Sequence, residues 1–155
     1  MGMKIKGDQE LLDKLAALQR LRPGAQRLAL YAGAKVMADA LTEAVGRLPI
    51  DNGSRHPLHV ISTQDRDDIA RGVGIATFQD NGDVVDTLIG FNGYISRTEE
   101  KYPNGVPIPL IVRSIESGSS VRAEYPFVKK AMRAAKKQAL EAMQAAADQE
   151  LSKAK

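Results

Sequence analysis

The sequence predicts an α+β fold in which a small antiparallel β-sheet of three to four strands packs against two long helices, one in the N-terminal half and one at the C-terminal end. Two observations lead to this prediction. Apolar residues recur at helical spacing before residue 46 and again after residue 127, whereas between residues 58 and 91 they follow the two-residue period of strands. The 155 residues are 43% hydrophobic and 26% charged, which fits one globular domain, 1–155.

Leucine and alanine spacing predicts the first two helices. Residues 8–21 form a short amphipathic helix with Asp8 as its N-cap, and Pro23-Gly24 interrupts the pattern. A longer helix follows and ends near Gly46. Its expected apolar stripe repeats every four residues: Leu28, Ala32, Val36, Ala40 and Ala44. Because this stripe is mostly alanine, it would let another element approach closely.

The middle of the chain is predicted to form the sheet. Asp51-Asn52-Gly53 is a strong turn signal that leads from the second helix into the strands. We expect strands over residues 58–62, 72–78 and 84–91, with a polar loop between the first two and a hairpin loop at 80–83. Residues 92–109 hold three prolines and two glycines, and they predict a long exposed loop that orders against a neighbouring molecule.

The last third is predicted to be helical. Residues 110–118 fit either a strand or a short helix, and Gly118, a natural residue after a helix C-terminus, favours the helix. Pro126 opens a long helix of about residues 127–150. One face of this helix carries apolar residues such as Val128, Ala139 and Met143, and that face must be buried.

The opposite face of the last helix is basic, and it is the candidate partner-contact surface. At 100° per residue its five cations fall within about 120° of arc. They are Lys129, Lys130, Arg133, Lys136 and Lys137. Residues 121–155 carry a net charge of +4, whereas the whole chain carries +3. The face suits acidic protein partners or nucleic acid phosphates, and its plain alternative is a solvated helix face.

Catalytic and metal-binding patterns are weak in this sequence. It contains no cysteine, so thiol chemistry and cysteine zinc sites are excluded. His56 and His59 are separated by Pro57-Leu58, and we interpret them as surface histidines at a strand entrance instead of metal ligands. Asp65, Asp67 and Asp68 are interpreted as a solvated loop. We therefore expect no catalytic residue, metal, cofactor or small-molecule ligand. The apolar runs are too short to cross a membrane, and no signal-peptide core stands at the N-terminus.

Four short motifs resemble the tail-completion, or head-to-tail joining, proteins of tailed phages, the family often described as minor tail components. They are the opening IKGDQELL at 5–12, LPIDNG at 48–53, ESGSS at 116–120 and Pro126-Phe127 at the start of the final helix. The resemblance extends over nearly the whole chain.

The resemblance implies a structural virion protein of a phage or prophage and not an enzyme. Such a protein completes the tail where it meets the head connector, as a subunit of a homo-oligomeric ring, in contact with head-connector or tail proteins. It would be located in the tail or neck of the virion, and in the bacterial cytoplasm during assembly. Membranes and nucleic acid would not be its partners. The alternative is a small basic nucleoid-type protein that places the last helix on DNA phosphates.

Overall fold

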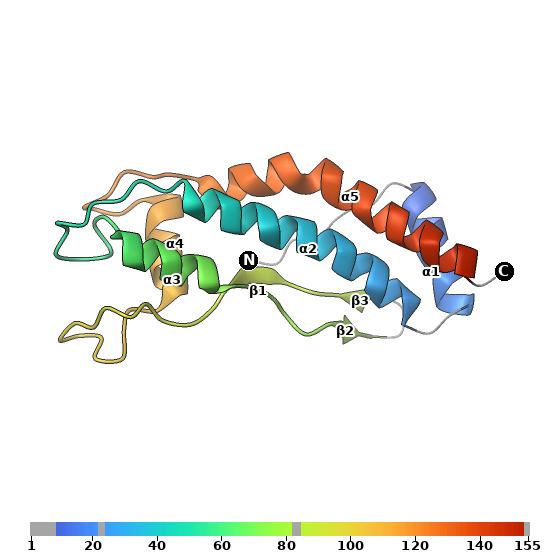
Figure 1. Ribbon diagram of the computed structural model, residues 1–155, viewed down its shortest axis with the longest axis horizontal. Helices are drawn as coiled ribbons and strands as arrows, with labels where there is room; N and C mark the ends of the chain where they lie inside the picture. The colour runs from blue at the N-terminus through green and yellow to red at the C-terminus, as the bar shows by residue number, and fades with distance from the viewer. Residues whose placement is uncertain (1–8, 22–23, 82–84, 154–155) are drawn as a thin grey trace. The chain divides into compact units, whose positions relative to one another are not determined.

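The computed structural model describes residues 9–21, 24–81 and 85–153, and Figure 1 traces them from blue to red. The elements in chain order are α1 (Gln9–Leu21), α2 (Ala25–Gly46), α3 (Thr63–Arg71), β1 (Val73–Ile75), β2 (Gln79–Asp80), β3 (Val85–Asp86), β4 (Ile89–Phe91), α4 (Ile108–Ser117) and α5 (Phe127–Lys153). The α+β fold with long helices is confirmed. Asp8, the expected N-cap, lies outside the described residues.

The described chain divides into two compact units. Unit 1 combines the stretch up to Ala38, the stretch from Ile75 to Ile89 and the stretch from Ala134 onward, and unit 2 combines residues 39–74 and 90–133. Helices α2 and α5 each contribute to both units. Each unit therefore draws on segments that are far apart in the sequence, and each is described separately below.

Alanines make up much of the core of unit 1, where α2 and α5 lie side by side (Figure 1). Leu18 of α1 packs with three fully buried alanines, Ala25, Ala29 and Ala147. A Cβ at Gly33 would lie 2.4 Å from Met143 Cγ, so α2 approaches α5 as closely as a glycine allows. The expected close approach of an alanine-lined helix is thus present in unit 1.

The buried stripe of α2 is shifted by one residue from the predicted one. Leu28 is 55% exposed, and the other members of the predicted stripe are half-buried. The stripe that is buried comprises Ala25, Ala29, Gly33, Met37, Leu41 and Val45. Both stripes have the same four-residue period, and α2 is apolar on more than one side, so periodicity alone could not choose the face. The contacts of α2 with the other elements determine which of its faces is buried.

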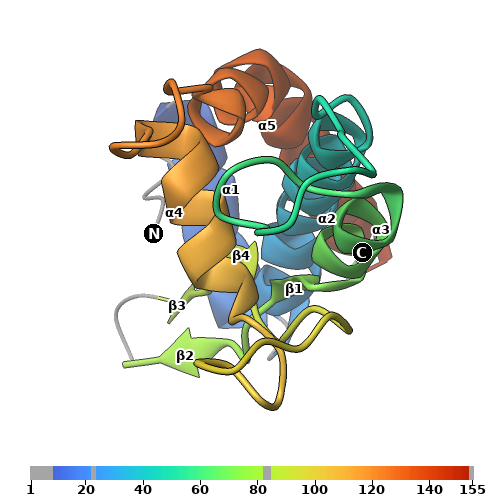
Figure 2. The same ribbon diagram turned by 90° about the vertical axis from the view of Figure 1, so that its left-hand side faces the viewer.

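Unit 2 has a core of larger aliphatic side chains. Its fully buried members include Leu41, Val45, Ile61, Ile69 and Ile111. Helices α3 and α4 contact each other in this unit. Figure 2 shows α4, in orange, and the loop that leads from it toward α5.

The strands form two short two-stranded sheets instead of one sheet of three to four strands: β1 pairs with β4, and β2 pairs antiparallel with β3. The predicted strand at 58–62 was wrong, since only Ile61 makes a bridge, with Ile50. Residues 56–59 instead form a turn, in which the His59 N–H donates to the His56 carbonyl over 3.0 Å. Gly72 lets β1 and β4 come together, because a Cβ there would lie 2.6 Å from the Asn92 carbonyl oxygen.

Helix α3 occupies the segment predicted to be a polar loop. It begins with a capping box: the Ser62 hydroxyl accepts from the Asp65 N–H over 3.2 Å, and the Asp65 carboxylate accepts from the Ser62 N–H over 2.8 Å. Asp65 and Asp68 are buried and only Asp67 is exposed. The prediction of three solvated aspartates was therefore wrong for two of them.

Residues 92–107 form a folded excursion, not a loop that is exposed throughout. Ile95 and Val106 are buried, and the Ile95 N–H donates to the Val106 carbonyl over 3.1 Å. Gly105 has a φ of +94°, a left-handed conformation that favours glycine. The chain then enters α4, which confirms the helical alternative for residues 110–118, and Gly118 follows it with a φ of +73°. Gly53, in contrast, is not among the glycines of the described chain that have left-handed backbone.

Candidate interaction surface

The basic face of α5 (Lys129, Lys130, Arg133, Lys136 and Lys137) is exposed in the structure at all five positions. None of these side chains makes an ion pair within the described part of the chain. The opposite side of the helix is buried at Val128, Ala135, Ala139 and Met143. The helix therefore has the two faces that its sequence predicts, and its cations are free to meet a partner.

Glu116 fixes the start of α5. Its carboxylate accepts from the backbone N–H groups of Val128 and Lys129, over 2.8 and 3.0 Å. The first N–H groups of a helix have no partner inside the helix, and the positive end of the helix dipole favours a negative charge there. A side chain from α4 thus serves as the N-terminal cap of α5.

Gly118 allows the chain to reverse direction after α4. Besides its positive φ, a Cβ at this position would lie 2.9 Å from the Glu124 backbone nitrogen. The Tyr125 N–H reaches back to the Ile115 carbonyl over 2.7 Å. The ESGSS motif at 116–120 therefore has a local structural role: its glutamate caps α5, and its glycine folds the chain so that the cap is in reach. Sequence reasoning singled out the motif but missed the cap.

A buried carboxylate network ties the excursion at 92–107 to α3. Arg97 donates to the Asp65 carboxylate over 2.5 Å and to the Ser54 carbonyl over 2.9 Å. Asp68 accepts from the Ser96 N–H over 2.7 Å, from Gln64 over 3.0 Å, and from Arg71. Burial opposes ionisation of Asp68, but these hydrogen bonds to its charged form outweigh it, so the pKa of Asp68 lies below the ordinary 3.8.

His56 and His59 stack on each other, with ring centroids 5.4 Å apart. His56 Nε2 lies 2.8 Å from the Glu99 carboxylate, and its Nδ1 accepts from the Leu58 N–H over 3.1 Å. Both ring nitrogens of His56 therefore have a partner within the chain. In the described part of the chain, no three histidine, aspartate or glutamate side chains gather closely enough to hold a metal ion.

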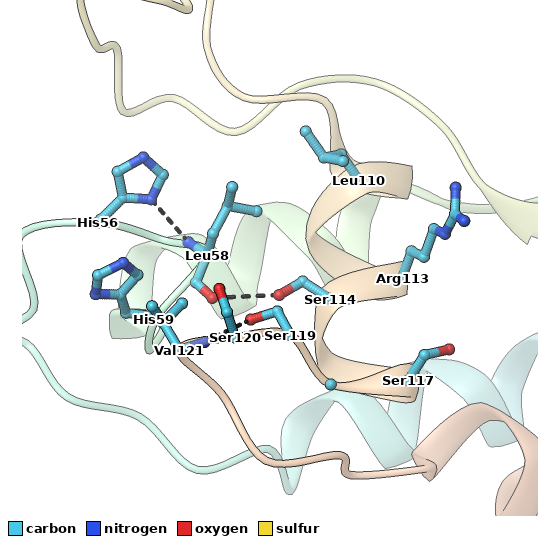
Figure 3. A pocket seen from close by; sticks show the side chains of 11 residues that line it. His56, Leu58, His59, Leu110, Arg113, Ser114, Ser117, Ser119, Ser120 and Val121 are labelled. Carbon is cyan, nitrogen blue, oxygen red and sulfur yellow. Dashed lines mark hydrogen bonds between the residues drawn. The ribbon is translucent and has the colours of Figure 1, made fainter.

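The turn at 56–59, helix α4 and the loop after it line a groove of about 620 Å³ in unit 2 (Figure 3). Ser114 of α4 donates to the Leu58 carbonyl over 3.2 Å. Arg122 donates to the carbonyls of His59 and Pro57, over 2.6 and 3.2 Å, and fastens the loop to the turn. Burial lowers the pKa of Arg122. The groove is the second surface of this chain that could receive a partner.

None of the helices described in residues 9–21, 24–81 and 85–153 is both long enough and apolar enough to span a bilayer. Comparisons of the chain with protein-family models, with curated proteins and with solved structures returned no match.

Proposed function

We propose that this chain is a structural virion protein of a tailed phage or prophage, which joins or completes the tail at the head–tail interface. It acts as one subunit of a homo-oligomeric ring and has no catalytic role. In this proposal it is located in the virion tail or neck, and in the bacterial cytoplasm while virions assemble. Its partners are further copies of itself and the adjoining head-connector or tail proteins.

The basic face of α5 is the observation that carries the proposal. Five exposed cations stand on one face of a helix whose other face is buried, and none has a carboxylate partner in the described chain. Unpaired like charges repel each other, and a complementary acidic surface on a neighbour would remove this repulsion and direct association. The short motifs that resemble tail-completion proteins support the same assignment, and two of them, ESGSS and Pro126-Phe127, lie at the start of this helix.

Charge reversal tests the proposal. The triple variant Lys130→Glu, Arg133→Glu, Lys137→Glu should fold normally, because exposed charges contribute at most about 1 kcal/mol each. It should fail to complement a phage or prophage that lacks the gene. The matched control Arg20→Glu, Arg55→Glu, Lys101→Glu changes the net charge equally at other exposed positions and should support tail assembly. Normal assembly by the first variant would show that the basic face is only a solvated surface.

The same five cations also fit the alternative, a small DNA-binding protein that uses α5 on phosphates. If all five neutralised phosphates, the affinity for duplex DNA would fall with salt at a slope of about −4.5 in a log–log plot. A joining subunit should show no such dependence. Binding of duplex DNA that follows this slope and is lost in the triple variant would favour the alternative.

A further inference from the structure

The groove in unit 2 carries positive but no negative charge on its lining. Arg113 of α4 stands on the rim, the exposed imidazole of His59 lines the turn side, and no carboxylate belongs to the wall. The hydroxyls of Ser117 and Ser120 have no hydrogen-bond partner within the described part of the chain. These groups are free to donate to an acidic occupant.

The lining of the groove also includes three apolar side chains. Leu110 is 37% exposed and Val121 is 55% exposed, and the third apolar side chain is Leu58 of the turn. A groove with a cationic rim and an apolar wall suits an occupant that presents a carboxylate next to an aliphatic side chain. Such an occupant would bury the aliphatic group on Leu110 and Val121 and place the carboxylate on Arg113.

The chain itself presents this combination in unit 1, at the end of β3 and in the segment that follows it toward β4. Asp86 is exposed and Leu88 is 51% exposed. Exposure alternates along this stretch: Asp86 and Leu88 are exposed, and Thr87 between them is half-buried. This alternation indicates that the side chains of Asp86 and Leu88 lie on the same side. Asp86 makes no ion pair with any described residue.

The backbone of this segment is already held in place. The Leu88 carbonyl accepts from the Ala76 N–H over 2.8 Å, and the Thr87 hydroxyl donates to the Ala76 carbonyl over 2.6 Å. A segment that is ordered before it binds loses little conformational freedom on docking. Asp86 and Leu88 are therefore presented as a preformed pair.

We infer that Asp86 and Leu88 of one copy dock into the groove of a second copy, with Asp86 on Arg113 and Leu88 against Leu110 and Val121. The two contact surfaces are different, so the interface is heterologous. Repetition of a heterologous contact gives a closed ring or an open filament. This inference rests on the proposed function, because it supplies the contact between subunits of the ring.

A charge-swap experiment on the full chain tests the inference, with mass measured by sedimentation equilibrium over a range of concentrations. The single variants Asp86→Lys and Arg113→Glu should each weaken self-association by roughly tenfold or more, because each brings like charges together. The double variant Asp86→Lys, Arg113→Glu restores the opposite pairing and should regain most of the association. Asp67→Lys and Arg20→Glu, at other exposed positions, are the matched controls and should associate like the parent chain.

The outcomes separate this inference from the proposed function. If the parent chain associates and the single variants associate equally well, the docking contact is wrong while ring assembly stands. If both single variants fail and the double variant is no better than either, the two residues do not pair, and the inference also falls. If the parent chain remains monomeric at every concentration, both the inference and the proposed ring are overturned.

Discussion

Replacement of Gly33 by alanine would insert one methyl group into the closest contact between α2 and α5. The new Cβ would lie 2.4 Å from Met143 Cγ, 2.7 Å from its sulfur and 3.2 Å from the Ala139 carbonyl oxygen. Alanine inside a helix is favoured over glycine by up to about 1 kcal/mol. Overpacking of a filled site costs about 1–3 kcal/mol. Met143 can move but the backbone of Ala139 cannot move far, so we expect Gly33→Ala to lower the free energy of unfolding by about 1 kcal/mol.

Gly46 provides the matched control on the same helix. A Cβ there meets nothing within 4 Å, so Gly46→Ala should raise the free energy of unfolding by about 0.4–1 kcal/mol. Urea denaturation followed by circular dichroism measures both variants, and their unfolding free energies should differ by about 1–3 kcal/mol. In a Met143→Ala background the contacts with Cγ and the sulfur are gone and the Ala139 carbonyl oxygen at 3.2 Å remains, so Gly33→Ala should destabilise the protein much less than in the parent chain. Equal stabilisation by both glycine substitutions in the parent chain would refute the close packing of α2 on α5.

Two further predictions concern groups whose partners lie far away in the sequence. Glu116→Gln should lower the free energy of unfolding by about 1 kcal/mol, since it removes the negative charge at the start of α5, and Glu124→Gln, at an exposed site, should have almost no effect in the same denaturation assay. Asp68→Asn should destabilise the protein by about 1–3 kcal/mol at neutral pH, because the ionised carboxylate is the form that its donors stabilise. The pKa of Asp68 is lowered in the folded state, so its contribution is present above the ordinary carboxyl pKa and is lost as the pH falls through the folded-state value. The difference in unfolding free energy between the parent chain and Asp68→Asn should therefore become smaller in acid. A difference that stays constant with pH would show that the charge of Asp68 does not contribute to stability.

The sequence alone determined the helices whose signals are local. Pro126 and the helical spacing of apolar and basic residues predicted α5 and its exposed cations, and Gly118 indicated the end of α4. The breaks in the helical pattern near Gly24 and Gly46 likewise indicated the start and the end of α2. These features depend on residues within a few positions of each other.

The tertiary structure decided which faces are buried and which polar residues have partners. In the excursion, Asp65 is bound by Arg97 and Asp68 by Ser96, about 30 residues further along the chain. Without knowledge of these partners, the polar sequence of α3 predicts a solvated loop. Burial of a carboxylate is tolerable only where donors meet it, and nothing in the local sequence reports those donors. The choice between the two apolar stripes of α2 depended in the same way on its packing partners. Helical period can be read from one segment, but burial is a property of two segments in contact.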